Sequence, residues 1–226
     1  MLLTFGRFQA FCEEAAPSRD PEVIFENANP RATTEGGKII AEAARHFEEI
    51  TQRKIGEWTI RISFEEEVSV QGMNLIGNEH LRGVTMHSAH SSTIRIAVRK
   101  NSNWDRVLAH EVVHTFVRAT YGTANNTTLN EGLAEYVAAQ IFPAEVRRDL
   151  YNAKWGRGRF SQNLCPYVEG YRFCSEHARD ADFANFIAQE ITGSANSYIL
   201  LNYKWKLSAN NQQQQSTSAH QTIPAP

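Results

Sequence analysis

The sequence predicts an α+β fold in which a small mixed sheet is followed by a mainly helical half that carries the candidate site. Three observations lead to this class: a periodic helix near the N-terminus, two alternating strand patterns after it, and a series of helical patterns in the second half. The chain has 226 residues, of which 42% are hydrophobic. This length and composition suit one domain with an apolar core.

The N-terminal part divides into an irregular leader and an amphipathic helix. Residues 1–34 are polar in their second half and contain three prolines, so we expect no regular structure there. From Glu35, the apolar residues of EGGKIIAEAARHFEEITQRK recur at helical spacing. The first residues form a poor signal peptide because Arg7 interrupts their apolar run. By default we expect a cytoplasmic protein, with secretion left open.

Two segments alternate between apolar and polar residues, as half-buried strands do: EWTIRISF and STIRIAVRK. The glycine-containing segment between them, VSVQGMNLIGNEHLRGVTM, predicts one or two further short strands. The sheet is therefore small and lies in the first half of the chain.

The second half is predicted to be helical. The expected helices cover residues 104–121, 129–142, 144–151, a segment that starts at Pro166, 182–192 and 195–206. The last residues, 207–226, are low-complexity and rich in Gln, and we expect a disordered tail. Residues 35–206 are thus predicted to form a single domain.

Composition excludes several classes of function. The net charge is −2, without a basic run, so we expect no nucleic-acid partner. No apolar stretch reaches the roughly 18 residues of a membrane span. Of the three cysteines, Cys165 and Cys174 could pair in an oxidising compartment, while free thiols including Cys12 are the favoured interpretation.

The segment VLAHEVVHTF places two histidines one helical turn apart. His110 and His114 share a helix face and can point two imidazole nitrogens at one ion. Glu111 is turned by about 100° around the axis, where it can reach the water position without acting as a ligand. The surrounding residues are apolar, so the helix is expected to be buried and its polar groups must be satisfied. This H-E-x-x-H spacing indicates a catalytic Zn²⁺ site.

A third ligand is expected on the next helix, within TLNEGLAEY. Glu131 follows His114 by 17 positions, across a loop. Glu135 lies one turn later on the same face, where it can accept the ring N–H of a ligand histidine. The alternative, a solvated helix face, has to explain why both glutamates stand among small and apolar residues.

Together, H-E-V-V-H and N-E-G-L-A-E-Y resemble the gluzincin zinc metallopeptidases, in particular their aminopeptidase-like and peptidase MA-like branches. The resemblance implies a thermolysin-like zincin catalytic domain, with His110, His114 and Glu131 as zinc ligands, Glu111 as base and Glu135 behind the ligands. The segment CPYVEGYRF is similar to a P-Y-x-x-G segment of that family. It implies that Tyr167 hydrogen-bonds the developing oxyanion. By position alone, Tyr171 competes for this role and a core aromatic is the alternative.

The predicted function is zinc-dependent hydrolysis of a peptide or protein substrate, with endopeptidase activity favoured. The stretch before the histidine helix reads GVTMHSAH, without the G-A-M-E-N segment whose carboxylate binds a free N-terminus in the aminopeptidases. In the family, the strand before this helix binds substrate, which implies that role for STIRIAVR. Two alternatives stay open: a non-catalytic, zinc-clamped binding module, and an effector or toxin-type protease with one target. His87 and His90 are interpreted as part of a polar loop.

Overall fold

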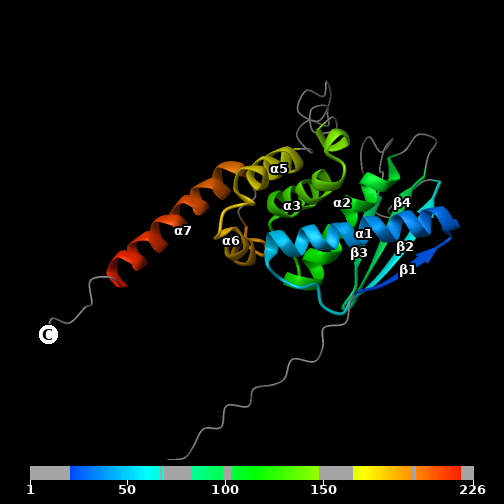
Figure 1. The fold of residues 1–226 in the computed structure, drawn as a ribbon, viewed down its shortest axis with the longest axis horizontal. Coiled ribbons are helices and arrows are strands. Elements are labelled where there is room, and N and C mark those ends of the chain that lie inside the picture. Colours follow the sequence, from blue (N-terminus) through cyan, green and yellow to red (C-terminus); the bar gives the residue numbers. More distant parts are fainter. Residues whose placement is uncertain are drawn as a thin grey trace, which may run out of the picture.

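The structure, a computed structural model, describes residues 21–66, 68, 83–98, 103–147, 165–194 and 197–219, the last eleven of these and residue 165 by their backbone alone. A four-stranded sheet forms one layer, and the helices form the other layer and the second half of the chain (Figure 1). The predicted α+β class, with a small mixed sheet and a helical half, is therefore confirmed. The short helix expected at 144–151 lies partly outside the described residues.

The sheet has the strand order β1-β2-β4-β3. Its strands are β1 (Glu22–Glu26), β2 (Thr59–Glu65), β3 (Gly83–His87) and β4 (Ser91–Ala97). The pairs β1–β2 and β2–β4 are parallel, and β3–β4 is antiparallel. The strand STIRIAVR, expected to bind substrate as an edge strand, corresponds to β4, which pairs on both sides and is therefore not an edge strand. In the described part of the chain, β1 and β3 form the two edges of the sheet, and β3 is the edge strand that packs against α2 (Trp104–Tyr121).

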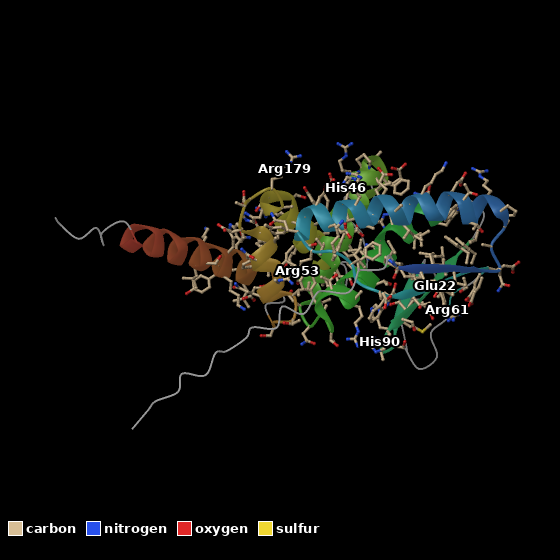
Figure 2. The ribbon with its side chains drawn as sticks, turned by 60° about the horizontal axis from the view of Figure 1, so that its bottom comes forward. Glu22, His46, Arg53, Arg61, His90 and Arg179 are labelled. Carbon is tan, nitrogen blue, oxygen red and sulfur yellow. The ribbon has the colours of Figure 1, made fainter. Side chains whose placement is uncertain are left out.

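The two faces of the sheet differ in character. One face carries Ile60, Ile62, Ile94 and Ile96, all fully buried beneath α1 (Pro30–Thr51) and α2 (Trp104–Tyr121). The opposite face carries charged side chains, among them Glu22 and Arg61 (Figure 2). Strand alternation thus separates a core face from a solvated face.

The leader contains more structure than the sequence predicted. β1 lies within residues 1–34 and pairs with β2, an interaction between segments far apart in the sequence that local composition does not reveal. α1 begins at Pro30 rather than Glu35: Pro30 occupies the first turn, and the Asn29 side chain accepts a hydrogen bond from the Ala32 N–H at 2.8 Å.

The helical half consists, in the described residues, mainly of α3 (Thr127–Ile141), α5 (Cys165–His177), α6 (Phe183–Glu190) and α7 (Tyr198–Ala219). α2 lies between the sheet and this half and contacts α1, α3, β3 and β4. Among the described helices none combines the length and apolar character of a membrane span.

One expectation about the C-terminal part needs correction. α7 continues through Ala219, into the segment 207–226 that was expected to be disordered. Its first half is docked on the domain, with Leu201 fully buried, and the glutamine run that follows extends the helix because Gln is a good helix former. Cys165 and Cys174 both lie on α5, nine positions and about 13 Å apart, so they cannot form a disulfide. Cys174 is a buried free thiol.

Candidate metal centre

α2 presents His110 and His114 on one face. The helix is buried on most sides, since Leu108, Val112, Val113 and Phe116 around the histidines are all fully buried. The two Nε2 atoms lie 3.1 Å apart, with the rings nearly perpendicular. Packing around α2 therefore buries most of both imidazole rings.

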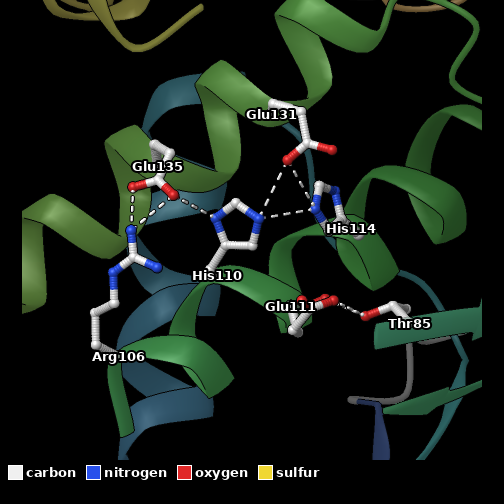
Figure 3. Close-up of polar contacts among 7 residues, drawn as sticks. All are labelled: Thr85, Arg106, His110, Glu111, His114, Glu131 and Glu135. Carbon is white, nitrogen blue, oxygen red and sulfur yellow. Dashed lines mark hydrogen bonds and ion pairs between the residues drawn. The ribbon is translucent and has the colours of Figure 1, made fainter. Parts of the chain in front are cut away.

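α3 brings Glu131 opposite the two histidines (Figure 3). The helix starts at a well-defined cap, because the buried Asn126 side chain accepts from the Leu129 N–H at 3.0 Å and donates to the Glu190 carbonyl at 3.1 Å. Glu131 Oε2 lies 3.2 Å from His110 Nε2 and 3.4 Å from His114 Nε2. The three residues predicted as ligands thus meet in one cluster.

The spacing of these three atoms fits a tetrahedral metal ion. Zinc bonds of about 2.0–2.1 Å at tetrahedral angles separate neighbouring ligand atoms by about 3.3 Å. The observed separations of 3.1, 3.2 and 3.4 Å match this value. Glu131 Oε2 is buried and makes no hydrogen bond in the described part of the chain, as expected of an atom that ligates an ion. Two imidazoles and one carboxylate form a donor set that catalytic zinc sites use.

Charge is balanced within the cluster even without a metal. Burial lowers the pKa of His110, but Glu135 and Glu131 more than compensate and raise it to about 10. Burial of Glu131 acts against ionisation, yet the two histidines hold its pKa well below the usual range. Protons and a metal ion therefore compete for the same nitrogens.

Behind His110, two buried residues form a second layer of contacts. His110 Nδ1 lies 3.1 Å from Glu135 Oε1, and Arg106 Nη2 donates to both carboxylate oxygens of Glu135 at 2.7 and 2.6 Å. Glu135 therefore orients the His110 ring so that Nε2 faces Glu131, and in a metal-bound form the carboxylate could accept the Nδ1 proton. Glu135 thus occupies the position that was predicted for it. Arg106 was missed, although it precedes His110 by four residues on the same helix face.

Glu111 lies at the β3 side of the cluster (Figure 3). The Thr85 hydroxyl is 2.7 Å from Glu111 Oε2, to which it donates, and 3.0 Å from the Glu111 carbonyl oxygen. Close approach of the strand depends on Gly83, where a Cβ atom would lie 2.6 Å from Val107 Cγ1 and 2.9 Å from Glu111 Cγ. The sequence pattern does not distinguish Thr85, because only the strand pairing shows that this residue faces α2.

Tyr167, rather than Tyr171, lies at the cluster. The Tyr167 ring stacks on His110 with centroids 5.7 Å apart, whereas Tyr171 packs on Tyr136. Burial, with the nearby Glu131 and Glu111 carboxylates, raises the pKa of the Tyr167 phenol, which therefore stays protonated. α5 comes this close to α3 because two glycines meet: a Cβ on Gly132 would lie 2.2 Å from the Gly170 carbonyl carbon.

The segment HSAH, expected to be a polar loop, is partly strand. His87 is the last residue of β3, and its Nδ1 lies 2.8 Å from Ser92 Oγ on β4. Partial burial, together with charge repulsion from His114 and Arg118, lowers the pKa of His87 to about 4. His90 lies beyond the strand, against Trp58.

The fold and the donor set define an α+β domain with a candidate metal centre of two histidines and one glutamate. We find no family model and no curated protein that matches the sequence. In fold, the chain is similar to an M1 zinc metallopeptidase from Deinococcus radiodurans, with 17% sequence identity and a TM-score of 0.50. The match covers 91% of this chain and 49% of that protein, so this chain spans about half of its length. The similarity establishes a shared fold, and within it His110, His114 and Glu131 form a group that could hold a metal ion.

Proposed function

We propose that this protein is a zinc-dependent peptidase that cleaves internal peptide bonds. The observation that carries the proposal is the triangle of His110 Nε2, His114 Nε2 and Glu131 Oε2, with the Glu111 carboxylate beside it and outside the donor set. A base next to three donors is the arrangement of a hydrolytic site, in which one coordination position stays open.

His110, His114 and Glu131 would hold the ion, with Glu135 orienting His110. Zinc bound there would act as a Lewis acid and activate water for attack on a carbonyl. Glu111 takes the proton from the attacking water and later passes it to the leaving amine. Thr85 keeps the Glu111 carboxylate on the β3 side by its hydrogen bond at 2.7 Å. The Tyr167 phenol donates to the oxygen on which negative charge develops.

β3 is the strand along which we expect the substrate to bind. It pairs only with β4 in the described part of the chain, so its other edge can accept an extended peptide by backbone hydrogen bonds. Gly83 lies against Val107 and Glu111, the residue that follows the candidate ligand His110 in the sequence. A peptide added to this edge would therefore run past the Glu111 carboxylate.

The preference for internal bonds rests on the composition of β3. Its five residues, Gly83–His87, include no carboxylate that could bind the ammonium group of a free N-terminus. Met86 is 42% exposed at this edge instead. An apolar, uncharged strand suits the interior of a peptide chain better than a charged terminus.

The test is a cleavage profile. Zinc-loaded wild type and Glu111→Gln would be incubated with a mixed peptide library, and the products would be identified by mass spectrometry. We expect internal cuts with the wild type and at least a 100-fold lower cleavage rate in the variant. Glutamine keeps the volume of the side chain but cannot accept the proton from water. Glu66→Gln, the same change at an exposed position, serves as the matched control.

The competing function is a zinc clamp without catalysis. It predicts equal zinc content in wild type and Glu111→Gln, no cuts with either, and lower thermal stability on metal removal. Hydrolysis that persists in Glu111→Gln would contradict the mechanism. Cuts in a single protein target and none in the library would identify the narrow effector-type protease.

A further inference from the structure

Three alternate residues of β3 face α2 at successive positions along the helix. Strand alternation places Gly83, Thr85 and His87 on the same face. Gly83 contacts Val107 and Glu111, and Thr85 bonds Glu111. His87 comes next, about 7 Å further along the strand, at the His114 end of the metal cluster. The electrostatic effect of both His114 and Arg118 on His87 agrees with this position.

A hydrogen-bond chain defines which ring nitrogen of His87 carries the proton. Trp58 Nε1, which can only donate, lies 2.9 Å from Ser92 Oγ. Ser92 is 1% exposed, and its hydroxyl has one further partner among the described residues, His87 Nδ1 at 2.8 Å. Ser92 Oγ accepts from Trp58, and a buried hydroxyl that did not also donate its own proton would leave a hydrogen bond unmade. Ser92 therefore donates to His87 Nδ1. The ring proton of neutral His87 therefore sits on Nε2.

The remaining nitrogen is accessible. His87 is an exposed residue of the strand end, while its Nδ1 edge is turned to the buried Ser92. The accessible edge is thus the one that carries Nε2. In the described part of the chain, Nε2 makes no hydrogen bond. A fixed and accessible N–H donor recognises an acceptor, and along a peptide that acceptor is a backbone carbonyl oxygen.

We propose that His87 is a further substrate-binding residue, whose Nε2–H, held by the Trp58–Ser92 chain, donates to a backbone carbonyl oxygen of the peptide bound along β3. This inference rests on the proposed peptidase function. Ser92 and Trp58 act as positioning residues, because they orient the ring without touching the substrate. The low pKa of His87 agrees with a neutral ring at pH 7.

The first measurement needs neither metal nor activity. Imidazole ¹⁵N spectra of the metal-free protein at pH 7 would show the tautomer of His87. The signals of this ring are assigned by their absence from the spectrum of His87→Gln. We expect a protonated Nε2 and an unprotonated Nδ1 in the wild type, and a mixture of tautomers in Ser92→Ala. A protonated Nδ1 in the wild type would overturn the proposal.

The second measurement tests binding. Zinc-loaded wild type, His87→Leu and His87→Gln would be compared for KM and kcat on a peptide found in the cleavage profile. They would also be compared by calorimetry for affinity to a capped peptide that carries a phosphinate in place of one internal amide and is chosen independently of the cleavage profile. Loss of one neutral hydrogen bond predicts a roughly 3- to 10-fold weakening in His87→Leu, seen in KM and in phosphinate affinity, with kcat little changed. His87→Gln keeps a donor near the Nε2 position, so its KM and phosphinate affinity should lie close to the wild-type values.

The outcomes separate this proposal from the peptidase function. If wild type cleaves and both affinities are unchanged in His87→Leu, the His87 proposal fails and the peptidase function stands. If wild type cleaves nothing yet binds the phosphinate in a His87-dependent way, the binding role stands without proteolysis. A wild type that neither cleaves nor binds overturns both.

Discussion

At the scale of the residue, hydrogen bonds to single side chains decide how the site is oriented. Glu135 holds the ring of His110, Arg106 holds Glu135, and Thr85 holds Glu111. Two of these contacts join α2 to α3, and the third joins β3 to α2. Residues outside the donor set therefore fix the orientation of the site as much as the ligands themselves do.

Thr85→Val tests the orientation of Glu111. Valine keeps the branched shape of the side chain but removes the hydroxyl that donates to Glu111 Oε2. With the carboxylate less constrained, we expect kcat to fall about tenfold, with zinc content and KM unchanged. Steady-state kinetics and metal analysis measure these quantities.

Thr93→Val is the matched control for this variant. Thr93 lies on β4 opposite Met86, on the face of the sheet away from α2. The same substitution there should leave kcat at the wild-type value. Equal kcat values for Thr85→Val and wild type would show that the hydrogen bond does not position the base.

At the scale of the element, the approach of α5 to α3 places Tyr167 on the cluster. Gly132 and Gly170 allow the two backbones to touch, because neither carries a Cβ atom. Gly132 directly follows Glu131, so the same turn of α3 supplies a ligand and the contact for α5. A displacement of α5 would therefore separate the phenol from His110.

Two glycine-to-alanine substitutions give opposite predictions. In Gly132→Ala the new methyl group would lie 2.2 Å from the Gly170 carbonyl carbon, so we expect a loss of about 1–3 kcal/mol in the free energy of unfolding. In Gly37→Ala, within α1, nothing lies within 4 Å, so we expect a gain of up to about 1 kcal/mol from helix propensity. Urea denaturation of the metal-free proteins measures both. A stable Gly132→Ala would mean that α5 can shift without cost.

At the scale of the whole molecule, the metal centre lies where the sheet layer meets the helical half. α2 contacts both parts, and the buried charges of the site join α2 to α3. Protonation of these groups therefore affects the stability of the entire fold.

The pH dependence of unfolding should reflect Glu135. Burial alone would raise the pKa of this carboxyl, but His110 and Arg106 lower it below 4.5. A carboxylate with a depressed pKa contributes its full stability above pH 4.5 and loses it as the pH falls below that value. In metal-free protein, we therefore expect the free energy of unfolding to fall more steeply between pH 4.5 and 3 in wild type than in Glu135→Gln.

Denaturant titrations at several pH values, with Glu66→Gln as an exposed control, measure this slope. Glu66→Gln should retain the steep wild-type dependence. If all three proteins share one acid slope, Glu135 is not ionised in the folded state by its contacts with His110 and Arg106.

Much of the site was predictable because its parts are local. His110, Glu111 and His114 lie within one helical turn and a half, and Glu131 and Glu135 lie one turn apart on the next helix. Helical geometry converts such spacings into positions on a face. Thr85 and His87 could not be placed in this way, because their roles depend on which strand forms the edge of the sheet.

The sequence by itself determined most of the helices, though not the start of α1 or the extent of α7, together with the spacing of the candidate ligands and the alternation of the central strands. These features depend on neighbours a few residues away. Only the tertiary structure decided that β1 joins the sheet, that β3 is the edge and that Tyr167, not Tyr171, meets His110. These features result from packing between segments 30 or more residues apart. Side-chain volume, close glycine contacts and the burial of charge select them, and no short stretch of the sequence contains that information.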